Sequence, residues 1–232
     1  MKKISSGFLL TVLAAVLPFL FSCQKQEPVR TTTAIVTVRA DEPNQSVTFQ
    51  LDEQTVAYPS NIKISDFGSE PRRALINFSK PEEGEVNPVS SVGPMIHVNW
   101  IQFILTKPMA EDFGDENALE YGEDPVELVY DWVTLVEDGY LNLRFRTLWS
   151  NYGITHRINL VYTPQPDNPY CVTLYHDAMD DRPDYESDSI VAFKLDGLPD
   201  TGGETVDLKV RWTSFMGPKS ATFKYSTKKA SN

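Results

Sequence analysis

Cys23 lies where a secreted chain would be processed. It follows Leu20-Phe21-Ser22, and a small residue directly before a cysteine is typical of a bacterial lipoprotein signal, which is cleaved to leave a diacylated cysteine. The dipeptide Lys2-Lys3 gives the chain a positive start, and the apolar run from Gly7 to Phe21 is too short to span a membrane. The sequence therefore predicts a lipoprotein signal peptide over residues 1–22, with lipid, including palmitate, on Cys23. The alternative is an ordinary signal peptide with a chance cysteine.

A lipid on Cys23 would hold the mature chain at a membrane. Each buried CH₂ contributes about 0.8 kcal/mol, so two acyl chains attach a protein stably where one is marginal. Residues 23–30 are polar, contain a proline and are predicted to form a tether. Residue 24 is glutamine rather than aspartate, which favours the cell outer membrane over the inner one. Whether the protein faces the periplasm or the cell surface stays open.

The segment from Asp177 to Asp188 is rich in the carboxylates that bind hard cations. Its acidic side chains include Asp180, Asp181, Asp184, Glu186 and Asp188. A calcium loop of the EF-hand type that began at Asp184 would need glycine at 189 and glutamate at 195, where the chain has Ser189 and Leu195. A solvated loop is therefore the favoured interpretation, and weak Ca²⁺ binding is the alternative.

The histidines and the second cysteine do not form a catalytic pattern. His97, His156 and His176 fall in three different predicted strands or strand ends, without the spacing of metal ligands. Cys171 lies on a predicted strand, and no electropositive neighbour or histidine partner can be assigned to it, so we expect a packed small residue. If Cys23 is lipidated, Cys171 has no disulfide partner.

The motifs of common enzymes are missing from the sequence. It has no glycine-rich phosphate loop, zincin helix or nucleophile elbow, and Gly217-Pro218-Lys219-Ser220 lacks the upstream glycine of a P-loop. Trp149 and Tyr152 flank a predicted turn and could stack on a sugar ring, although packing is favoured. We therefore predict no enzyme activity, no catalytic or metal site and no cofactor.

The charge of the chain excludes one class of partner. The chain has 32 acidic and 21 basic residues, a net charge of −11, and removal of a signal that holds two lysines and no acid brings this near −13. Affinity for nucleic acid comes largely from lysine and arginine on phosphates, so nucleic acid is not expected as a partner.

The elements that must position any site are predicted to be strands. From Val126 to Tyr162, three segments of strand character suggest a β-meander, with turns at Glu137-Asp138-Gly139 and at Ser150 to Gly153. In its middle strand, Leu141, Leu143, Phe145 and Trp149 share one face. Prolines and glycines interrupt the rest so often that no helix of ordinary length stands out, and the class is all-β.

Two domains are expected. Five short strands over residues 31–110 suit a small barrel of the oligonucleotide/oligosaccharide-binding (OB) type, and about seven antiparallel strands over 125–232 suit a β-sandwich. The acidic, glycine-containing segment 111–124 between them is predicted to be a linker.

Six short stretches carry a resemblance to a known family. They are Phe49-Gln50-Leu51-Asp52 with Tyr58-Pro59, Arg73 to Phe78, Val98-Asn99-Trp100 with Leu105-Thr106-Lys107, Asp124 to Glu127, Gly139 to Phe145, and Leu174-Tyr175-His176. In this order, behind a lipoprotein signal, the chain resembles the NigD-like lipoproteins of Gram-negative anaerobes. The resemblance implies an OB-type domain followed by a β-sandwich. The founding member belongs to a bacteriocin operon and is an immunity protein by hypothesis, and no catalytic residues are attached to the family.

These observations favour a non-catalytic envelope lipoprotein that presents a surface to a protein partner, such as a bacteriocin in an immunity role. The alternative is a cell-surface glycan-binding or glycan-uptake accessory. An enzyme is the least favoured of the three.

Overall fold

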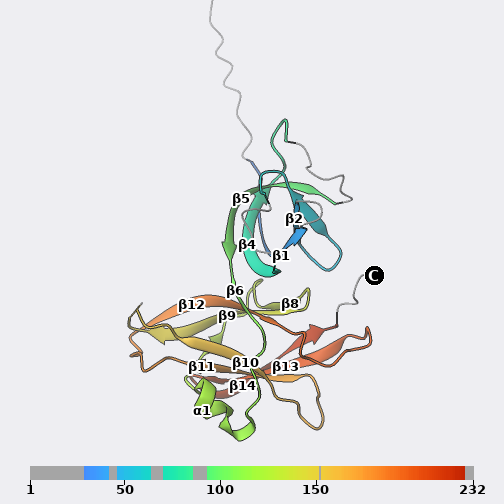
Figure 1. The fold of residues 1–232 in the computed structure, drawn as a ribbon. Coiled ribbons are helices and arrows are strands. Elements are labelled where there is room, and N and C mark those ends of the chain that lie inside the picture. Colours follow the sequence, from blue (N-terminus) through green and yellow to red (C-terminus); the bar gives the residue numbers. More distant parts are fainter. Residues whose placement is uncertain (1–28, 42–45, 64–69, 86–92, 152, 228–232) are drawn as a thin grey trace, which may run out of the picture.

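A computed structural model of the protein describes residues 29–41, 46–63, 70–85, 93–151 and 153–227 (Figure 1). Apart from one short 3-10 turn and one short helix, the named elements of this part of the chain are strands, which confirms the all-β class. Residues 1–22 and Cys23 lie outside the described residues, as does most of the expected tether. No helix within the described ranges is long and apolar enough to cross a bilayer.

The N-terminal strands form a closed barrel in the order β1-β2-β3-β5-β4. Its strands are β1 (Thr32–Asp41), β2 (Ser46–Gln50), β3 (Val56–Pro59), β4 (Arg72–Ser79) and β5 (Met95–Phe103). Alternate residues of each strand point inward, because side chains in a strand alternate between its two faces. The buried core includes Val36, Val38, Val47, Phe49, Ala74, Ile76 and Val98. The strands expected in this half from alternation are therefore confirmed.

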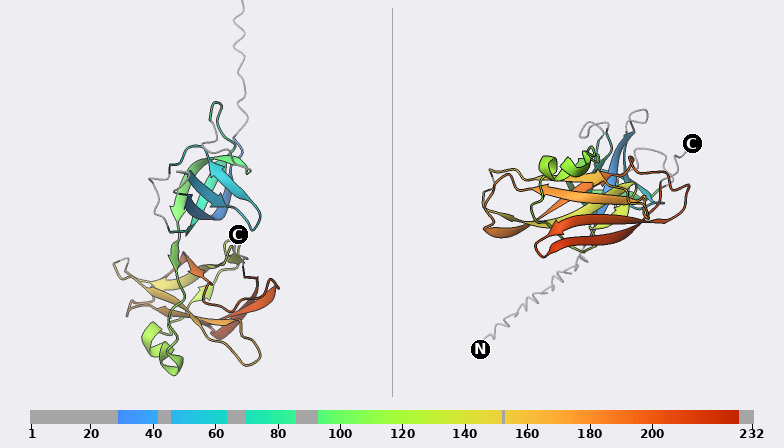
Figure 2. Two further views of the ribbon diagram at one scale, coloured as in Figure 1. Left: turned by 45° about the vertical axis from the view of Figure 1, so that its right-hand side comes forward. Right: turned by 90° about the horizontal axis from the view of Figure 1, so that it is seen from below.

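The C-terminal part is a sandwich of two sheets, which lie as two layers below the barrel in Figure 1. One sheet has the order β6-β12-β9-β7, from β6 (Leu105–Lys107), β12 (Tyr185–Lys194), β9 (Tyr140–Trp149) and β7 (Glu127–Leu128), with β8 (Leu135–Glu137) paired to β9. The other has the order β10-β11-β13-β14, from β10 (Arg157–Tyr162), β11 (Cys171–Asp177), β13 (Val206–Ser214) and β14 (Gly217–Tyr225). Figure 2 shows the two layers from other sides.

The prediction of a continuous meander is wrong at its second turn. β9 pairs with β12, whereas β10 pairs with β11 in the opposite sheet. The apolar face of β9, with Leu143 and Phe145, and that of β10, with Ile158 and Leu160, belong to the same buried core. The alternation of apolar and polar residues correctly identified which face of each strand is buried. It could not identify the partner strand, because two strands that face each other across a sandwich show the same alternation as two strands of one hairpin.

The acidic segment 111–124 is not the linker that its composition suggested. The sandwich already begins at β6, which pairs in parallel with β12 immediately after the barrel strand β5 ends. The acidic segment forms a 3-10 turn, η2 (Gly114–Glu116), and the helix α1 (Asn117–Tyr121), which contacts β10 and β11. The Tyr121 ring lies 6.0 Å from that of Tyr175 on β11. The acidic side chains of segment 111–124 are exposed to solvent. Both a linker and a segment that covers the outside of a sheet can carry such charges, so composition alone could not distinguish the two.

The barrel and the sandwich share a third buried cluster. Ile35 of the barrel packs with Ile104, which precedes β6, and with Val133, Tyr140 and Ala192 of the sandwich. A dry cluster across a domain junction resists relative motion of the domains, because separating them would expose apolar surface to water.

Arg73 adds a polar connection to this cluster. Its side chain is fully buried, and its guanidinium donates to the Thr37 hydroxyl (2.8 Å) in the barrel and to Asn142 Oδ1 (3.0 Å) and Glu137 Oε2 (2.9 Å) in the sandwich. It also lies over the Tyr140 ring, 5.6 Å from its centroid. Burial lowers the pKa of Arg73, and the bond to Glu137 partly offsets this. The guanidinium therefore joins residues of both domains into one network.

Candidate functional site

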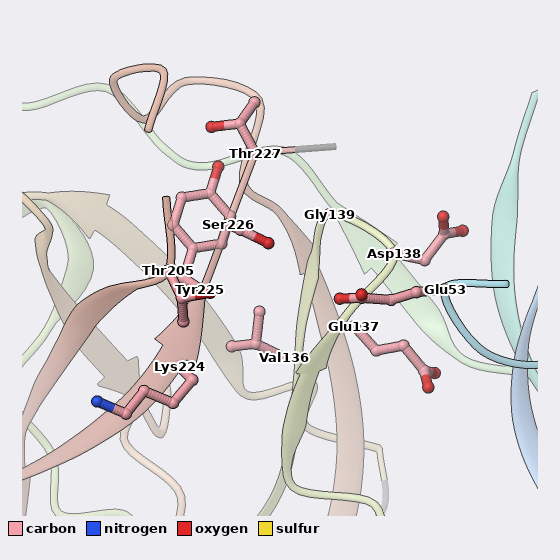
Figure 3. A pocket seen from close by; sticks show the side chains of 10 residues that line it. All are labelled: Glu53, Val136, Glu137, Asp138, Gly139, Thr205, Lys224, Tyr225, Ser226 and Thr227. Carbon is pink, nitrogen blue, oxygen red and sulfur yellow. The ribbon is translucent and has the colours of Figure 1, made fainter. Parts of the chain in front are cut away.

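A hollow of about 310 Å³ opens beside this junction, and we call it the junction hollow (Figure 3). Its walls come from the β2–β3 turn of the barrel, from the β8–β9 hairpin and from the end of β14. The lining residues are Glu53, Val136, Glu137, Asp138, Gly139, Thr205, Lys224, Tyr225, Ser226 and Thr227. Ligand sites occur preferentially at domain interfaces, so this hollow is the first candidate for a binding site.

Glu53 reaches into the hollow from a turn that the neighbouring aspartate stabilises. The Asp52 carboxylate accepts hydrogen bonds from the backbone N–H groups of Gln54 (2.9 Å) and Thr55 (2.8 Å). These bonds hold the pKa of Asp52 below its usual value, the bond from Gln54 most strongly. Figure 3 shows the Glu53 side chain extending from this turn toward the β8–β9 hairpin. The carboxylate of Glu53 is thus presented by a fixed turn.

The facing hairpin is closed by Asp138 and Gly139. Both have positive φ, 52° and 78°, and they connect the paired residues Glu137 and Tyr140, which is the geometry of a two-residue type I′ turn. This turn places Asp138 against Arg39 of the barrel, with 2.5 Å between Asp138 Oδ2 and Arg39 Nη2. The predicted turn at this position is confirmed, and its role in joining the two domains was not visible in the sequence.

The third wall is the end of the last strand. Lys224 pairs with Asp207 across β13 and β14, with 2.6 Å between Nζ and Oδ1. Tyr225 is buried, which raises the pKa of its phenol. Thr201 and Thr227 bond reciprocally, each backbone N–H donating to the other's hydroxyl at 2.9 and 3.0 Å. The wall is therefore rigid up to the last described residue.

The arrangement of charges in the hollow suits the binding of a cation. Glu137 and Asp138 are each paired with an arginine, whereas Glu53 has no ion pair within the part of the chain that the structure describes. None of the lining residues is a histidine or a cysteine, so the hollow does not pair a nucleophile with a base of the usual kind. A positively charged group could enter between Glu53 and the hairpin.

The acidic loop from Asp177 to Asp188 is used largely for internal pairing. Asp188 lies on β12 and pairs with Arg144 (2.9 Å) and Arg146 (2.7 Å) of β9. Asp181 accepts hydrogen bonds from the Ser150 hydroxyl and the Ser150 backbone N–H, which hold its pKa far below the usual value. Within the described residues, no group of three potential metal ligands is found in this loop.

Two of the histidines meet, although their spacing gave no indication of it. His156 Nδ1 lies 3.0 Å from His176 Nε2, and His156 Nε2 lies 3.3 Å from Asp181 Oδ2. The Trp149 ring stacks on His156 with 3.8 Å between centroids. Burial lowers the pKa of His176, and the neighbouring His156 lowers it further. The pairing of β10 with β11 brings these rings together, and that pairing could not be read from the sequence.

The third histidine belongs to a separate cluster on the barrel. His97 Nδ1 lies 2.7 Å from Glu85 Oε1, and its Nε2 lies 3.9 Å from Glu82 Oε1. These three side chains offer ligand atoms within 4.8 Å of one another, close enough in principle for one divalent cation. Glu85 also accepts a hydrogen bond from the Ser60 hydroxyl (2.7 Å), so the cluster is a connected network of its own.

The remaining residues that the sequence offered as candidate site residues have structural surroundings. Cys171 is fully buried and free, as expected for a packed thiol. The face of Trp149 is occupied by His156, which favours packing over sugar stacking, and Tyr152 lies outside the described residues. Gly217-Pro218-Lys219-Ser220 is the start of strand β14 and not a phosphate loop.

Comparison with known proteins agrees with this architecture. The NigD-like N-terminal OB domain matches residues 35–104, and the NigD-like C-terminal beta sandwich domain matches residues 108–225. These ranges place the boundary at β6, as the strand pairing does. None of the curated proteins compared with the chain matches it.

The solved structures that are similar to this chain include the following three. A candidate toxin-related protein from Parabacteroides distasonis has a TM-score of 0.70 and 35% identity, over 85% of this chain and 94% of that one. A NigD-like immunity protein from Bacteroides caccae has a TM-score of 0.59 and 21% identity, over 84% and 97%. A candidate lipoprotein from Bacteroides fragilis has a TM-score of 0.52 and 14% identity, over 87% and 100%. The last two show likeness of fold alone. The two domain matches together span most of the chain and show that it belongs to the NigD-like family.

Proposed function

We propose that this protein is a non-catalytic, lipid-anchored protein of the cell envelope that binds a cationic protein or peptide partner, such as a bacteriocin against which it confers immunity. The junction hollow carries this proposal, because both domains contribute carboxylates to it and the buried junction holds them in place. A volume of about 310 Å³ has room for a basic side chain or a chain end of such a partner.

The charge of the whole chain supports a cationic partner. With 32 acidic and 21 basic residues, the protein attracts positive peptides over the screening length of about 8 Å at physiological ionic strength, which speeds encounter more than it tightens the final complex. The lipid at Cys23 rests on the signal pattern Leu20-Phe21-Ser22-Cys23, and the name of the B. caccae protein, which shares the fold, is consistent with an immunity role.

A peptide titration tests the site. A fluorescein-labelled oligolysine peptide should bind the purified protein more weakly as salt rises, since exposed charge attraction is screened. Glu53→Gln should weaken binding by about two- to fivefold at low salt, the range for an exposed ion pair of about 0.5 to 1 kcal/mol. Glu83→Gln is the matched control, because Glu83 is exposed on the barrel and carries the same charge away from the hollow. Equal effects of the two variants would reject the junction hollow.

The immunity role has a separate test in cells. Deletion of the gene should lower survival against a toxin encoded beside it, and the Glu53→Gln gene should restore survival less well than the wild-type gene. Turnover of any envelope substrate by the purified protein would contradict the proposal as a whole.

A further inference from the structure

A second hollow lies on the outer face of the four-stranded sheet and shares no lining residue with the junction hollow, and we call it the outer-face hollow. It has a volume of about 440 Å³ and is lined by side chains of β11, β13 and β14, with the segment that follows α1 at its rim. The lining side chains used below are Thr173, Tyr175, Lys209, Arg211, Thr213 and Ser220. Nothing in the proposed function uses this surface.

A row of three residues crosses the floor of this hollow. Thr173 of β11 is the register partner of Arg211 in β13, and Arg211 is in turn the partner of Ser220 in β14. Lys209 lies two residues before Arg211 and therefore on the same face of the strand. Two cations thus lie side by side on one sheet face of an acidic protein.

These two cations lack partners of opposite charge. Among the described residues, neither Lys209 nor Arg211 forms an ion pair with a carboxylate, although acidic residues outnumber basic ones in the chain. Instead, Arg211 Nη2 donates to the hydroxyls of Thr163 (3.2 Å) and Thr173 (2.9 Å). These neutral hydroxyls accept hydrogen bonds from Nη2 but leave the charge of the guanidinium uncompensated, and Arg211 Nε is buried without a hydrogen-bond partner among the described residues.

Arg211 is also held in position. The Thr163 and Thr173 hydroxyls that receive its hydrogen bonds bond to each other at 2.8 Å, and Arg211 is only partly exposed. A guanidinium fixed in this way loses little conformational freedom when it binds a carboxylate, for which its planar fork is complementary. The floor is therefore organised for a planar anion before any ligand arrives.

The rim selects among anions. Glu123 and Asp124 border the hollow, and they would repel a ligand that carries several negative charges, such as a phosphate ester. Around the two cations, Thr173, Thr213, Ser220 and Tyr175 present hydroxyl groups, which both donate and accept hydrogen bonds. A volume of about 440 Å³ leaves room for more than a bare carboxylate. These features together match a ring with several hydroxyls and one carboxylate.

We propose that the outer-face hollow binds a sugar acid, with its carboxylate on Arg211 and Lys209 and its ring hydroxyls on the surrounding hydroxyl side chains. Either a free uronic acid or the terminal uronate of a glycan chain supplies this chemistry. Binding at this site is independent of the cationic partner proposed for the junction hollow.

Calorimetric titration of the purified protein with galacturonate, galactose and a trimer that has one terminal galacturonate on two neutral sugars tests the proposal. Galacturonate should bind, and galactose, which has a hydroxymethyl group in place of the carboxylate, should bind at least about tenfold more weakly, corresponding to about 1.4 kcal/mol for a charge-assisted pair. Equal or tighter binding of the trimer identifies a chain end as the source, and binding of the monomer alone identifies the free sugar.

The variants assign the binding to the floor of the hollow. Arg211→Gln should lower the affinity about tenfold, and Arg211→Lys should lower it less, because it keeps the charge and loses the fork. Arg182→Gln is the matched control, since Arg182 is exposed, lies 3.6 Å from Asp184 and lines neither hollow, and this variant should bind galacturonate as tightly as the wild type. Melting curves identify any variant that has lost its fold.

Several results would overturn the proposal. One is galactose binding as tightly as galacturonate, and another is full affinity in folded Arg211→Gln. Inorganic phosphate displacing galacturonate at equal concentration would show an unselective anion site instead. Failure of the folded wild-type protein to bind either uronate would also reject it, and none of these outcomes affects the oligolysine titration at the junction hollow.

Discussion

Replacing Arg73 should weaken the contact between the two domains most clearly, and the loss should appear in the free energy of unfolding. Replacement of Arg73 by methionine keeps an unbranched side chain of similar length but removes the three hydrogen bonds to Thr37, Asn142 and Glu137. Removing one partner of a buried ion pair costs about 3 to 5 kcal/mol. The Glu137 side chain retains 17% exposure and can be partly hydrated, so we expect the lower part of that range, about 3 kcal/mol of unfolding free energy.

Urea unfolding, followed by tryptophan fluorescence and far-UV circular dichroism, measures this loss. Arg72→Met is the matched control. Arg72 is exposed and contacts the Phe103 ring at 4.0 Å, a cation–π contact worth about 0.5 to 1 kcal/mol. If the buried network couples the domains, the double variant Arg73→Met with Glu137→Gln should lose at least about 1 kcal/mol less than the sum of the single variants. An Arg73→Met variant as stable as Arg72→Met would refute the reasoning.

Further predictions concern the anchor, the core and the buried histidines. Cys23→Ser should release the protein from membrane fractions, and a processed variant that stays tightly attached would contradict lipidation. Phe145→Ala should cost about 3 to 5 kcal/mol, because the ring lies in the sandwich core, whereas Arg144→Ala at a 40% exposed side chain should cost about 1 kcal/mol or less; chemical denaturation compares the two. Burial lowers the pKa of His176, so the unfolded chain takes up its proton first, and stability should fall as pH drops below about 6.5. The melting temperature of His176→Gln should then change less than that of the wild type between neutral and mildly acidic pH, and an equal change would exclude His176 as the cause.

Local patterns in the sequence predicted most strands, because each strand buries one face. Val47 and Phe49 alternate with polar neighbours and are buried in the barrel, and Asp138-Gly139 forms the predicted hairpin turn. Which strands pair with each other in the sheets was not predictable in the same way. The strand that contains Leu143 pairs with β12, more than forty residues further along the chain. The alternation of buried residues specifies which face of a strand is inside, but it does not specify which strand lies beside it.

The sites were harder to predict than the strands. Arg73 lies in a segment that reads as an ordinary strand, and its burial results from packing of a second domain that no local pattern encodes. His156 and His176 are twenty residues apart in sequence and meet only because β10 pairs with β11. Lys209 and Arg211 alternate on one strand as surface cations commonly do, and the lack of ion pairs to them among the described residues can be recognised only from the neighbouring strands.

The parallel pairing of β6 with β12 has a consequence for how the two domains can be separated in evolution or by protein engineering. β6 covers the edge of β12 at Val191, Ala192 and Phe193, and it follows the last barrel strand after a single residue, Ile104. A sandwich that began at residue 108 would expose this edge, with its free backbone groups and apolar side chains, to pairing with other chains. Exchange of barrels between relatives should therefore succeed only where the break lies before Leu105, and a sandwich cut after Lys107 should self-associate.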